Sequence, residues 1–389
     1  MKILMLNHNP KWRGTFFRAF HFSRCLARRG HRVTLVTISP RNLLRFRSQQ
    51  LDGVEILESP DLLAGKGRTG WDPYDTLRRT LRLRKPGDFD LVHGFDCRPA
   101  VIFPALALRR RTGVPFLSDW ADWWGRGGIV EERSRLMRWT LGPVETFFEE
   151  HFRPAADGIT VTSRALQDRA VALGIDRRRV RYLPSGSDVE TIRPLPKAEM
   201  RRELGLPEHG KILVYIGFIN YDIDCLVRAF PLVQERFPDV LLLMVGQRHP
   251  VTRRLCREHR ISRGLIETGV VPFQELPRYL ACGDVLLLPF TDKICNIGRG
   301  PIKLGDYMAA GRPIVTMPVG DLRRVFEEDE PIGLLAGDEP ESFARAVCEL
   351  LSDPERAEEY GRNARRLAER KYSWEILTAG LEEYYRTFG

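Results

Sequence analysis

The feature that most constrains the fold is a repeated alternation of short apolar runs with longer amphipathic stretches. The chain begins with KILMLNH, continues with FFRAFHFSRCLARRGH and then reads RVTLVTI. A short apolar run bounded by turn signals is typical of a buried strand, and the periodic stretch is typical of a helix that ends at Gly30. Strand, helix and strand in this order predict adjacent parallel strands joined by a right-handed crossover.

The same pattern continues to a segment rich in proline and glycine and then begins again. Before that segment, buried strands are predicted at residues 90–95, 114–120 and 158–163. The segment contains Pro184, Gly186 and Pro194, which is typical of a linker. After it, strands are predicted at residues 212–218, 240–246, 265–271, 285–290 and 313–318. The sequence therefore predicts two doubly wound α/β domains, residues 1–188 and 189–371, and a terminal amphipathic helix over 372–389.

The composition indicates the cellular compartment and argues against a structural metal site. No apolar run approaches the roughly 18 residues that a membrane-spanning helix needs, and the apolar start of MKILMLNHNP is too short for a signal peptide. The seven cysteines are scattered without a CxxC pair, and the eight histidines show no metal-ligand spacing. We expect a cytoplasmic protein with no structural metal.

Charge narrows the range of partners. The net charge is +10, which favours acidic partners such as nucleotide phosphates or anionic lipid. Basic and acidic residues alternate along the chain and no nucleic-acid-binding motif is present, so no nucleic-acid partner is predicted. Residues 65–70, GKGRTG, match GxGxxG in letters only, because no convincing strand leads directly into them.

The stretch NIGRGPIKLGDYMAAG, residues 296–311, combines the residue types of an anion site. Proline at the first helical position and glycines just before it predict a glycine loop that runs into a helix at Pro301. The free N–H groups of such a helix attract anions, and Arg299 and Lys303 add full charge. Lys303 and Asp306 lie three residues apart, so they could serve a phosphate and a sugar hydroxyl. The alternative is a tight turn with a surface Lys–Asp pair.

The order of these pieces resembles the GT-B fold, and more narrowly the GT4-type family of retaining, nucleotide-sugar-dependent glycosyltransferases. The similar segments are RGHRVTLVT, AADGITVTSRALQDRAVALGI, VRYLPSGSDVETIRP, ILVYIGF, LLLMVGQ, GVVPFQELPRYLACGDVLLLP and KLGDYMAAGRPIV. The resemblance implies two Rossmann-like domains that face a cleft. Residues 1–188 would bind the acceptor and 189–371 the nucleotide sugar, while helix 372–389 would pack back toward the N-terminal domain.

The resemblance assigns a donor site to the second domain. Asp306 matches the second glutamate of the family's E-x7-E motif, which binds the nucleotide ribose, whereas Gly298 replaces the first. The other donor-binding residues implied are Gly217, Gln247, Val271, Phe273, Asn296 and Gly300. The family's Arg and Lys that clamp the diphosphate are missing from GFINYDIDCLV, which carries Asn220, Asp222 and Asp224 instead. Arg299, Lys303 and the helix N-terminus are left to neutralise a UDP or GDP group.

The acceptor side is assigned to loops of the first domain. Gly14 stands in the family's glycine loop, where Lys11 and Trp12 could bind a saccharide or lipid-linked saccharide. In DWADWWGRGG, residues 119–128, Asp119, Asp122 and Trp123 suit hydrogen bonding to and stacking on a sugar. The alternative is that the tryptophans only anchor this loop.

The predicted reaction is transfer of a sugar to a hydroxyl with retention, without a tightly bound cofactor. Lys303 and Arg299 would stabilise the leaving diphosphate, and Asp119 or His93 would steer the acceptor hydroxyl, although His93 could equally be structural. The competing hypotheses are a nucleotide-sugar epimerase or hydrolase and a non-catalytic sugar-nucleotide-binding relative. Residues 133–154 are basic and aromatic, so they could form either a membrane-surface helix or a helix packed on the domain.

Overall fold

A computed structural model describes residues 1–389 except 40–43, 63–68, 84–87, 218–221, 249, 260 and 262. Most of the segment GKGRTG and Asn220 therefore lie outside the described residues. The chain divides into two compact units. Unit 1 comprises Met1–Ser185, Gly298–Gly300 and Trp374–Gly389, and unit 2 comprises Gly186–Ile297 and Pro301–Ser373.

Unit 1 is built on an eight-stranded sheet, counted over the described residues, in the order β3-β4-β2-β1-β5-β6-β7-β8. All neighbouring strands are parallel except β3 and β4. The strands are β1 (Lys2–Pro10), β2 (Arg32–Ile38), β3 (Arg47–Leu51), β4 (Val54–Ser59), β5 (Leu91–Phe95), β6 (Phe116–Trp120), β7 (Gly158–Val161) and β8 (Val180–Tyr182). The helices are α1 (Thr15–Arg28), α2 (Pro73–Arg82), α3 (Pro99–Thr112), α4 (Arg135–Thr140), α5 (Gly142–Phe152), α6 (Arg164–Ala172) and α16 (Trp374–Arg386).

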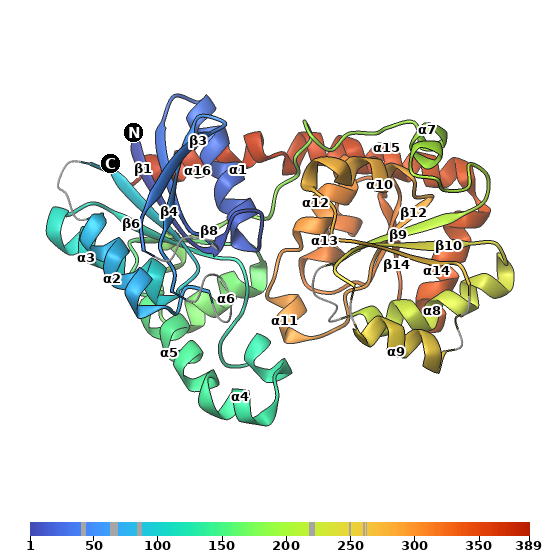
Figure 1. The fold of residues 1–389 in the computed structure, drawn as a ribbon, viewed down its shortest axis with the longest axis horizontal. Coiled ribbons are helices and arrows are strands. Elements are labelled where there is room, and N and C mark those ends of the chain that lie inside the picture. The colour runs from blue at the N-terminus through green and yellow to red at the C-terminus, as the bar shows by residue number, and fades with distance from the viewer. Residues whose placement is uncertain are drawn as a thin grey trace. The chain divides into compact units, whose positions relative to one another are not determined.

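Both faces of this sheet are buried, which explains why its strands are continuous apolar runs. Successive residues of β1 point to opposite faces: Ile3 and Met5 lie in the core under α1, and Leu4 and Leu6 in the core under α3. The terminal helix α16 contributes Trp374, Leu377, Leu381 and Tyr385 to the first of these cores. Figure 1 shows α16 beside α1.

Unit 2 holds a parallel sheet of six strands among the described residues, in the order β11-β10-β9-β12-β13-β14. Its strands are β9 (Ile212–Gly217), β10 (Leu241–Gly246), β11 (Leu265–Gly269), β12 (Val285–Leu288), β13 (Ile314–Thr316) and β14 (Gly333–Leu335). Its helices are α7 (Lys197–Glu203), α8 (Ile223–Arg236), α9 (Pro250–Glu258), α10 (Leu276–Ala281), α11 (Ile294–Ile297), α12 (Ile302–Ala309), α13 (Asp321–Glu327), α14 (Pro340–Ser352) and α15 (Pro354–Leu367). Within the described part of the chain, no helix is both long and apolar enough to span a bilayer.

The observed elements differ from the predicted ones where apolar patterning is weak. Strands β3, β8 and β14 were not predicted, because RSQQL is polar and exposed and the other two are only three residues long. Strand β4 was also missed, although four of its six residues, VEILES, are buried. Residues 133–154 form two helices rather than one, because Pro143 begins a new helix at α5.

The division of the chain also differs in one detail from the predicted domains. Gly298–Gly300 groups with unit 1, although the residues on both sides belong to unit 2. The Gly300 carbonyl accepts a hydrogen bond from Ser185 Oγ at 2.9 Å. A side chain at Gly300 would approach the Thr162 carbonyl to 2.9 Å, so only glycine lets this loop lie so close.

Candidate functional site

Polar side chains gather at the carboxyl edge of the unit 1 sheet, where open α/β sheets bind ligands. Asn7 and His8 come from the end of β1, Asp96 follows β5, and Asp119 and Asp122 lie at the end of β6 and just after it. Because β1, β5 and β6 are neighbours and parallel, these side chains converge on one edge. The first four are buried, whereas Asp122 is partly exposed.

Asp119 is a fully buried carboxylate that is already paired. Arg18 from α1 donates to it from Nε at 3.0 and 3.1 Å and from Nη2 at 2.9 Å. Thr160 Oγ1 donates to the same group at 2.6 Å. Arg18 also donates to the carbonyls of Leu183 and Pro184. This geometry favours a positioning role for Asp119 in place of the predicted contact with an acceptor hydroxyl.

His93 is also fully buried, and both of its ring nitrogens have partners. Nδ1 lies 2.6 Å from Tyr385 Oη of α16, and Nε2 lies 3.1 Å from Thr160 Oγ1. Burial lowers the pKa of His93 to about 4, so the ring is neutral near pH 7. The arrangement favours the structural alternative for His93 over the predicted catalytic one.

A second buried network at this edge was not predicted from the sequence. His8 Nε2 lies 3.0 Å from Asp96 Oδ2, and His8 Nδ1 lies 3.1 Å from Thr69 Oγ1. Arg98 Nε donates to the same carboxylate at 3.3 Å. Asp96 has a positive φ of 82°, which is strained for a residue other than glycine. The signal was available, because Asp96 directly follows a predicted strand, as Asp119 ends one.

Asp122 is the carboxylate at this edge that remains accessible. Burial raises its pKa to about 6, and the neighbouring Arg299 guanidinium offsets part of that rise. Arg299 belongs to the Gly298–Gly300 loop, which packs on unit 1. A partly exposed carboxyl that titrates near neutral pH can accept a hydrogen bond from a hydroxyl or hold its proton.

The loop around Asp122 is held by Glu149 of α5. The Glu149 carboxylate accepts from Trp120 Nε1 at 3.0 Å, from the Trp124 N–H at 2.9 Å and from the Gly125 N–H at 2.8 Å. Trp123 donates from Nε1 to the Arg126 carbonyl at 2.8 Å, and the Arg169 guanidinium lies 4.4 Å from the centre of its ring. The tryptophans therefore anchor the loop, as in the alternative reading. Trp123 keeps a partly exposed side chain.

The loop before α1 presents a second exposed ring. Trp12 has a φ of 63° and packs edge-on against Phe16 and Phe20, with ring centres 5.5 Å apart in each pair. Gly14 has a φ of 50°, and a side chain there would meet Asn9 Nδ2 at 2.6 Å. Lys11 Nζ pairs with Glu58 at 2.7 Å, so its charge is partly neutralised.

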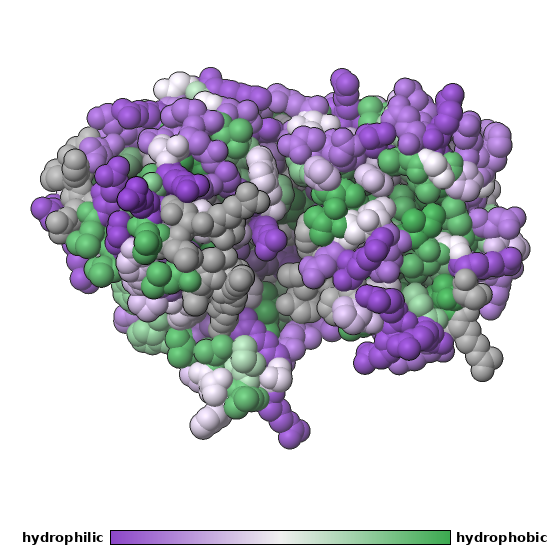
Figure 2. All heavy atoms as spheres, in the orientation of Figure 1, coloured by the Kyte–Doolittle hydropathy of each residue, from purple (hydrophilic) through white to green (hydrophobic). Residues whose placement is uncertain are grey.

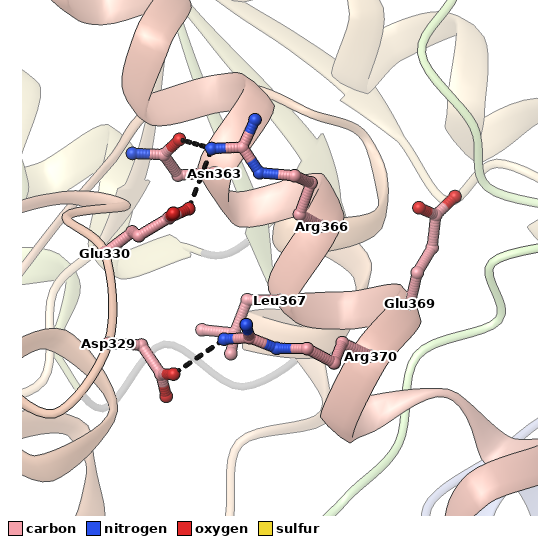
Figure 3. A pocket seen from close by; sticks show the side chains of 7 residues that line it. All are labelled: Asp329, Glu330, Asn363, Arg366, Leu367, Glu369 and Arg370. Carbon is pink, nitrogen blue, oxygen red and sulfur yellow. Dashed lines mark hydrogen bonds and ion pairs between the residues drawn. The ribbon is translucent and has the colours of Figure 1, made fainter.

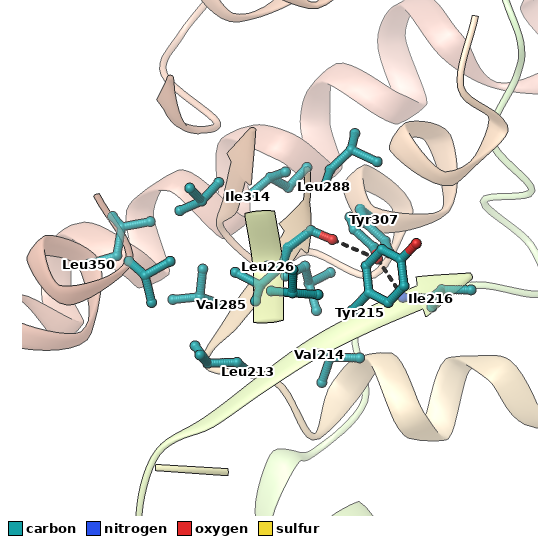
Figure 4. Packing of buried hydrophobic residues seen from close by; sticks show 14 of the residues in the cluster. Leu213, Val214, Tyr215, Ile216, Leu226, Val285, Leu288, Tyr307, Ile314 and Leu350 are labelled. Carbon is teal, nitrogen blue, oxygen red and sulfur yellow. Dashed lines mark hydrogen bonds between the residues drawn. The ribbon is translucent and has the colours of Figure 1, made fainter. Parts of the chain in front are cut away.

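In unit 2, helix α12 is fixed against the sheet by Tyr307. The Tyr307 hydroxyl donates to the Leu287 carbonyl at 3.1 Å. It accepts from the Ile216 N–H at 2.8 Å, as Figure 4 shows. Pro301 is the N-cap rather than the predicted first helical residue, and no side chain in the described part of the chain caps the helix. Tyr307 therefore fixes where the N-terminus of α12 lies against the sheet.

Lys303 and Asp306 lie on the first turns of this helix. Lys303 is partly exposed, and its Nζ lies 4.9 Å from the centre of the Tyr215 ring. Asp306 is buried, and burial together with neighbouring Asp188 raises its pKa well above the ordinary value. No hydrogen bond joins the Asp306 carboxyl to another of the described residues. A diol bound here would supply the donors that this carboxylate needs.

The remaining predicted donor residues differ in accessibility. Asn296 is buried, and its Nδ2 donates to Asp222 at 3.1 and 3.2 Å and to the Thr291 carbonyl at 2.8 Å, which indicates a structural role. Gly217 ends β9, and its carbonyl accepts from the Gln247 N–H at 3.2 Å. Gln247 is exposed, and Val271 and Phe273 are partly exposed. Gly298 is buried within unit 1 and not within the predicted donor domain.

A surface hollow of about 470 Å³ lies elsewhere on unit 2. Figure 3 shows the side chains that line it, with Arg366 bound to Glu330 and Asn363 and Arg370 bound to Asp329. These charges neutralise one another, and none of the predicted site residues lines the hollow. Across the described residues, no group of acidic, histidine or cysteine side chains could hold a metal ion.

Comparison with known families accounts for both halves of the chain. Residues 14–186 match the family described as a glycosyl transferase 4-like domain, and residues 210–353 match the family described as glycosyl transferases group 1. The chain belongs to the group 1 glycosyltransferases.

Individual relatives of this glycosyltransferase are distant. A GDP-mannose-dependent alpha-(1-6)-phosphatidylinositol monomannoside mannosyltransferase of Mycolicibacterium smegmatis is 26% identical over 263 residues, which cover 66% of this chain and 69% of that protein. Spore coat protein SA of Bacillus subtilis is 28% identical over 378 residues, 91% of this chain and 90% of the other. A solved sucrose-phosphate synthase from Thermosynechococcus elongatus superposes with a TM-score of 0.78 at 19% identity, over 99% of this chain and 98% of that one. The predicted GT-B fold of two Rossmann-like units is confirmed.

Proposed function

We propose that this glycosyltransferase moves a sugar from a nucleoside-diphosphate donor, UDP- or GDP-linked, to an acceptor hydroxyl with retention of anomeric configuration. The observation that carries this proposal is the start of α12. An uncapped helix N-terminus, a partly exposed lysine and a buried carboxyl stand there within two turns. These groups suit a diphosphate and a ribose diol. A relative named as GDP-mannose-dependent supports the same donor class.

In the proposed reaction, the bond between the anomeric carbon and the diphosphate oxygen breaks while the acceptor oxygen attacks from the same face. Lys303 and the N–H groups of α12 stabilise the charge that develops on the leaving diphosphate, and Arg299 adds positive charge beside Asp122. The acceptor proton passes to the leaving phosphate. No tightly bound cofactor takes part, and the donor is a substrate.

The acceptor half-site belongs to unit 1. Asp122 is the carboxylate that we assign to the acceptor hydroxyl, since Asp119 and His93 are buried and paired. We assign to the same half-site the exposed ring of Trp12 and the partly exposed side chains of Trp123 and Lys11, and Gly14 sets the turn of the loop before α1. A saccharide or lipid-linked saccharide is the proposed acceptor class. All seven cysteines are free thiols, which is consistent with the proposed cytoplasmic setting.

The test compares Lys303→Ala with Lys211→Ala. Lys211 precedes β9 at the opposite end of that strand from Gly217, so it is a matched control in the same unit. We expect Lys303→Ala to lower kcat by about 10²–10³, the usual cost of one donor to a developing oxyanion. Lys211→Ala should keep wild-type turnover.

The substrate survey uses UDP- and GDP-sugars with a panel of hydroxyl acceptors, and NMR of the product reads its anomeric configuration. An inverted product would overturn the retaining mechanism. Release of free nucleotide or a new sugar without any acceptor would indicate a hydrolase or epimerase instead. Calorimetric silence toward every nucleotide and nucleotide sugar would indicate a non-catalytic relative.

A further inference from the structure

Helix α4 exposes apolar side chains that none of the described residues of unit 1 buries. Its sequence is RLMRWT, and none of its six residues is buried. Trp139 is 80% exposed and Leu136 is 69% exposed, while Met137 is also exposed. Scattered exposed apolar residues are ordinary, but three of them close together on one six-residue helix mark an interaction site.

The exposed surface continues onto the outer face of α5. Val144, Phe147 and His151 are exposed at helical spacing, and the Phe147 and His151 rings stack with centres 4.9 Å apart. The inner face of the same helix buries Glu145 and Glu149. Together, the exposed apolar side chains of the two helices form a docking face, which comprises Leu136, Met137, Trp139, Val144 and Phe147. In Figure 1, α4 projects from unit 1 beyond α5, and Figure 2 shows hydrophobic and hydrophilic side chains side by side at that tip.

The hairpin that carries the docking face is firmly attached. Arg133 pairs with the buried carboxylate of Glu145, and the Ser134 side chain caps α4 by accepting from the Met137 N–H. Phe148 of α5 packs edge-on against Trp71 with ring centres 5.1 Å apart. The exposure of Trp139 and Leu136 is therefore a property of an anchored helix pair and not of a frayed end.

The charges around the docking face identify its partner. Arg135 and Arg138 stand between the apolar residues of α4, and both are exposed. A surface helix that alternates Arg with Trp and Leu suits lipid headgroups. Guanidinium groups bind lipid phosphates, and tryptophan favours the boundary between headgroups and acyl chains. Helix α4 carries two arginines and no acid of its own; Arg138 pairs with Glu131 at 3.2 Å on the exposed surface just before the helix, and Arg135 adds a second positive charge. Anionic lipid is the surface that complements this charge.

The same hairpin holds the loop that carries Asp122. Glu149 of α5 binds the N–H groups of Trp124 and Gly125, and the Arg133 guanidinium lies 5.8 Å from the centre of the Trp124 ring. The docking face and the accessible carboxylate are thus parts of one braced segment of unit 1.

We propose that α4 and the outer face of α5 dock this protein on an anionic phospholipid bilayer, with the Asp122 loop held beside the lipid surface. The second part rests on the proposed function and names its acceptor class: a hydroxyl of a saccharide linked to a lipid. The relative whose name includes phosphatidylinositol monomannoside is consistent with that class.

The first experiment is co-sedimentation of the full chain with phosphatidylcholine vesicles, with and without phosphatidylglycerol. We expect binding to the anionic vesicles that weakens as salt rises. The Leu136→Ser/Trp139→Ser variant should bind at least about tenfold more weakly, since two apolar side chains no longer enter the lipid. Arg135→Gln/Arg138→Gln should lose roughly tenfold or more and most of the salt dependence.

The matched control is Leu77→Ser on α2, which removes a leucine of 56% exposure from another surface of unit 1. It should bind vesicles as the wild type does. All substituted side chains are exposed, so thermal unfolding should be unchanged in every variant. Wild-type protein that ignores anionic vesicles, or a Leu136→Ser/Trp139→Ser variant that binds them fully, overturns the proposal.

Two further measurements distinguish lipid binding from dimerisation and from the transferase activity itself. Sedimentation velocity tests whether the docking face instead binds a second copy of the chain. If the wild-type protein is a dimer that does not bind vesicles, and Leu136→Ser/Trp139→Ser abolishes the dimer, the lipid proposal is overturned. Turnover of a water-soluble acceptor should be equal in wild type and Leu136→Ser/Trp139→Ser, whereas turnover of an acceptor embedded in anionic vesicles should fall at least about tenfold. Failure of vesicle binding leaves the transferase proposal standing, and failure of the Lys303 test leaves the lipid proposal standing.

Discussion

Replacing Arg18 by alanine tests whether the Arg18–Asp119 pair is the buried brace of unit 1. The change removes three contacts to the Asp119 carboxylate and two to main-chain carbonyls, all between 2.8 and 3.1 Å. Asp119 is fully buried, so its charge loses its main partner and cannot be rescued by water. Breaking a buried pair on one side costs about 3–5 kcal/mol.

The expected shift in Tm follows from the size of the unit. A domain of this size loses about 2–4 °C per kcal/mol, so Arg18→Ala should lower the Tm of unit 1 by roughly 6–20 °C. Differential scanning calorimetry measures it. Arg178→Ala, which removes an exposed arginine paired with Asp176, should barely move the Tm.

A double variant separates loss of the pair from loss of packing. Arg18→Met/Asp119→Leu replaces both charges by apolar groups and should regain most of the lost stability, because no unpaired charge remains. A Tm for Arg18→Ala within about 2 °C of the wild type would refute the structural role assigned to this pair.

The other predictions concern the acid–base groups of unit 1. Burial raises the pKa of Asp122 to about 6, so turnover should rise with pH through that value as the carboxylate forms. The pH profile of Asp122→Asn should lack this rise. A wild-type profile that is flat between pH 5 and 7 would count against the role of Asp122. Because the pKa of Asp122 is raised in the folded protein, the protonated carboxyl stabilises the fold. This contribution is complete below the ordinary titration range of Asp and is lost as pH rises through about 6. Asp122→Asn should remove that pH-dependent loss of stability in urea titrations. His93→Ala removes the hydrogen-bond partner of the buried Tyr385 hydroxyl and one of the two partners of Thr160 Oγ1, which still donates to Asp119. It should lower the free energy of unfolding by about 2–4 kcal/mol and change kcat only a few-fold below the Tm, whereas a hundredfold loss of kcat would restore the catalytic role.

The fold was predictable from the sequence where a buried strand consists of a continuous run of apolar residues. Both faces of the two sheets are covered, so ILVYIG of β9 and VLLL of β12 are continuous apolar segments and were recognised as strands. Strand β3 could not be recognised, because RSQQL lies at an exposed edge and is polar. Strands β8 and β14 are too short to show a period.

The candidate site was less predictable, because residue type does not reveal which side chains are already paired. Asp119 and Asp122 look alike in DWADWWGRGG, yet Arg18 and Thr160 enclose the first and leave the second accessible. Arg18 lies about a hundred residues away in sequence, at a separation that no local pattern reports. Asp188 could not be anticipated beside Asp306 for the same reason.

The most direct test of the central claim is a crystal structure with UDP or GDP bound. The diphosphate should lie at the N-terminus of α12 within hydrogen-bonding distance of Lys303 Nζ, and the ribose hydroxyls should donate to Asp306. Nucleotide density on another surface of the protein, such as the hollow beside Arg366 and Arg370, would contradict it.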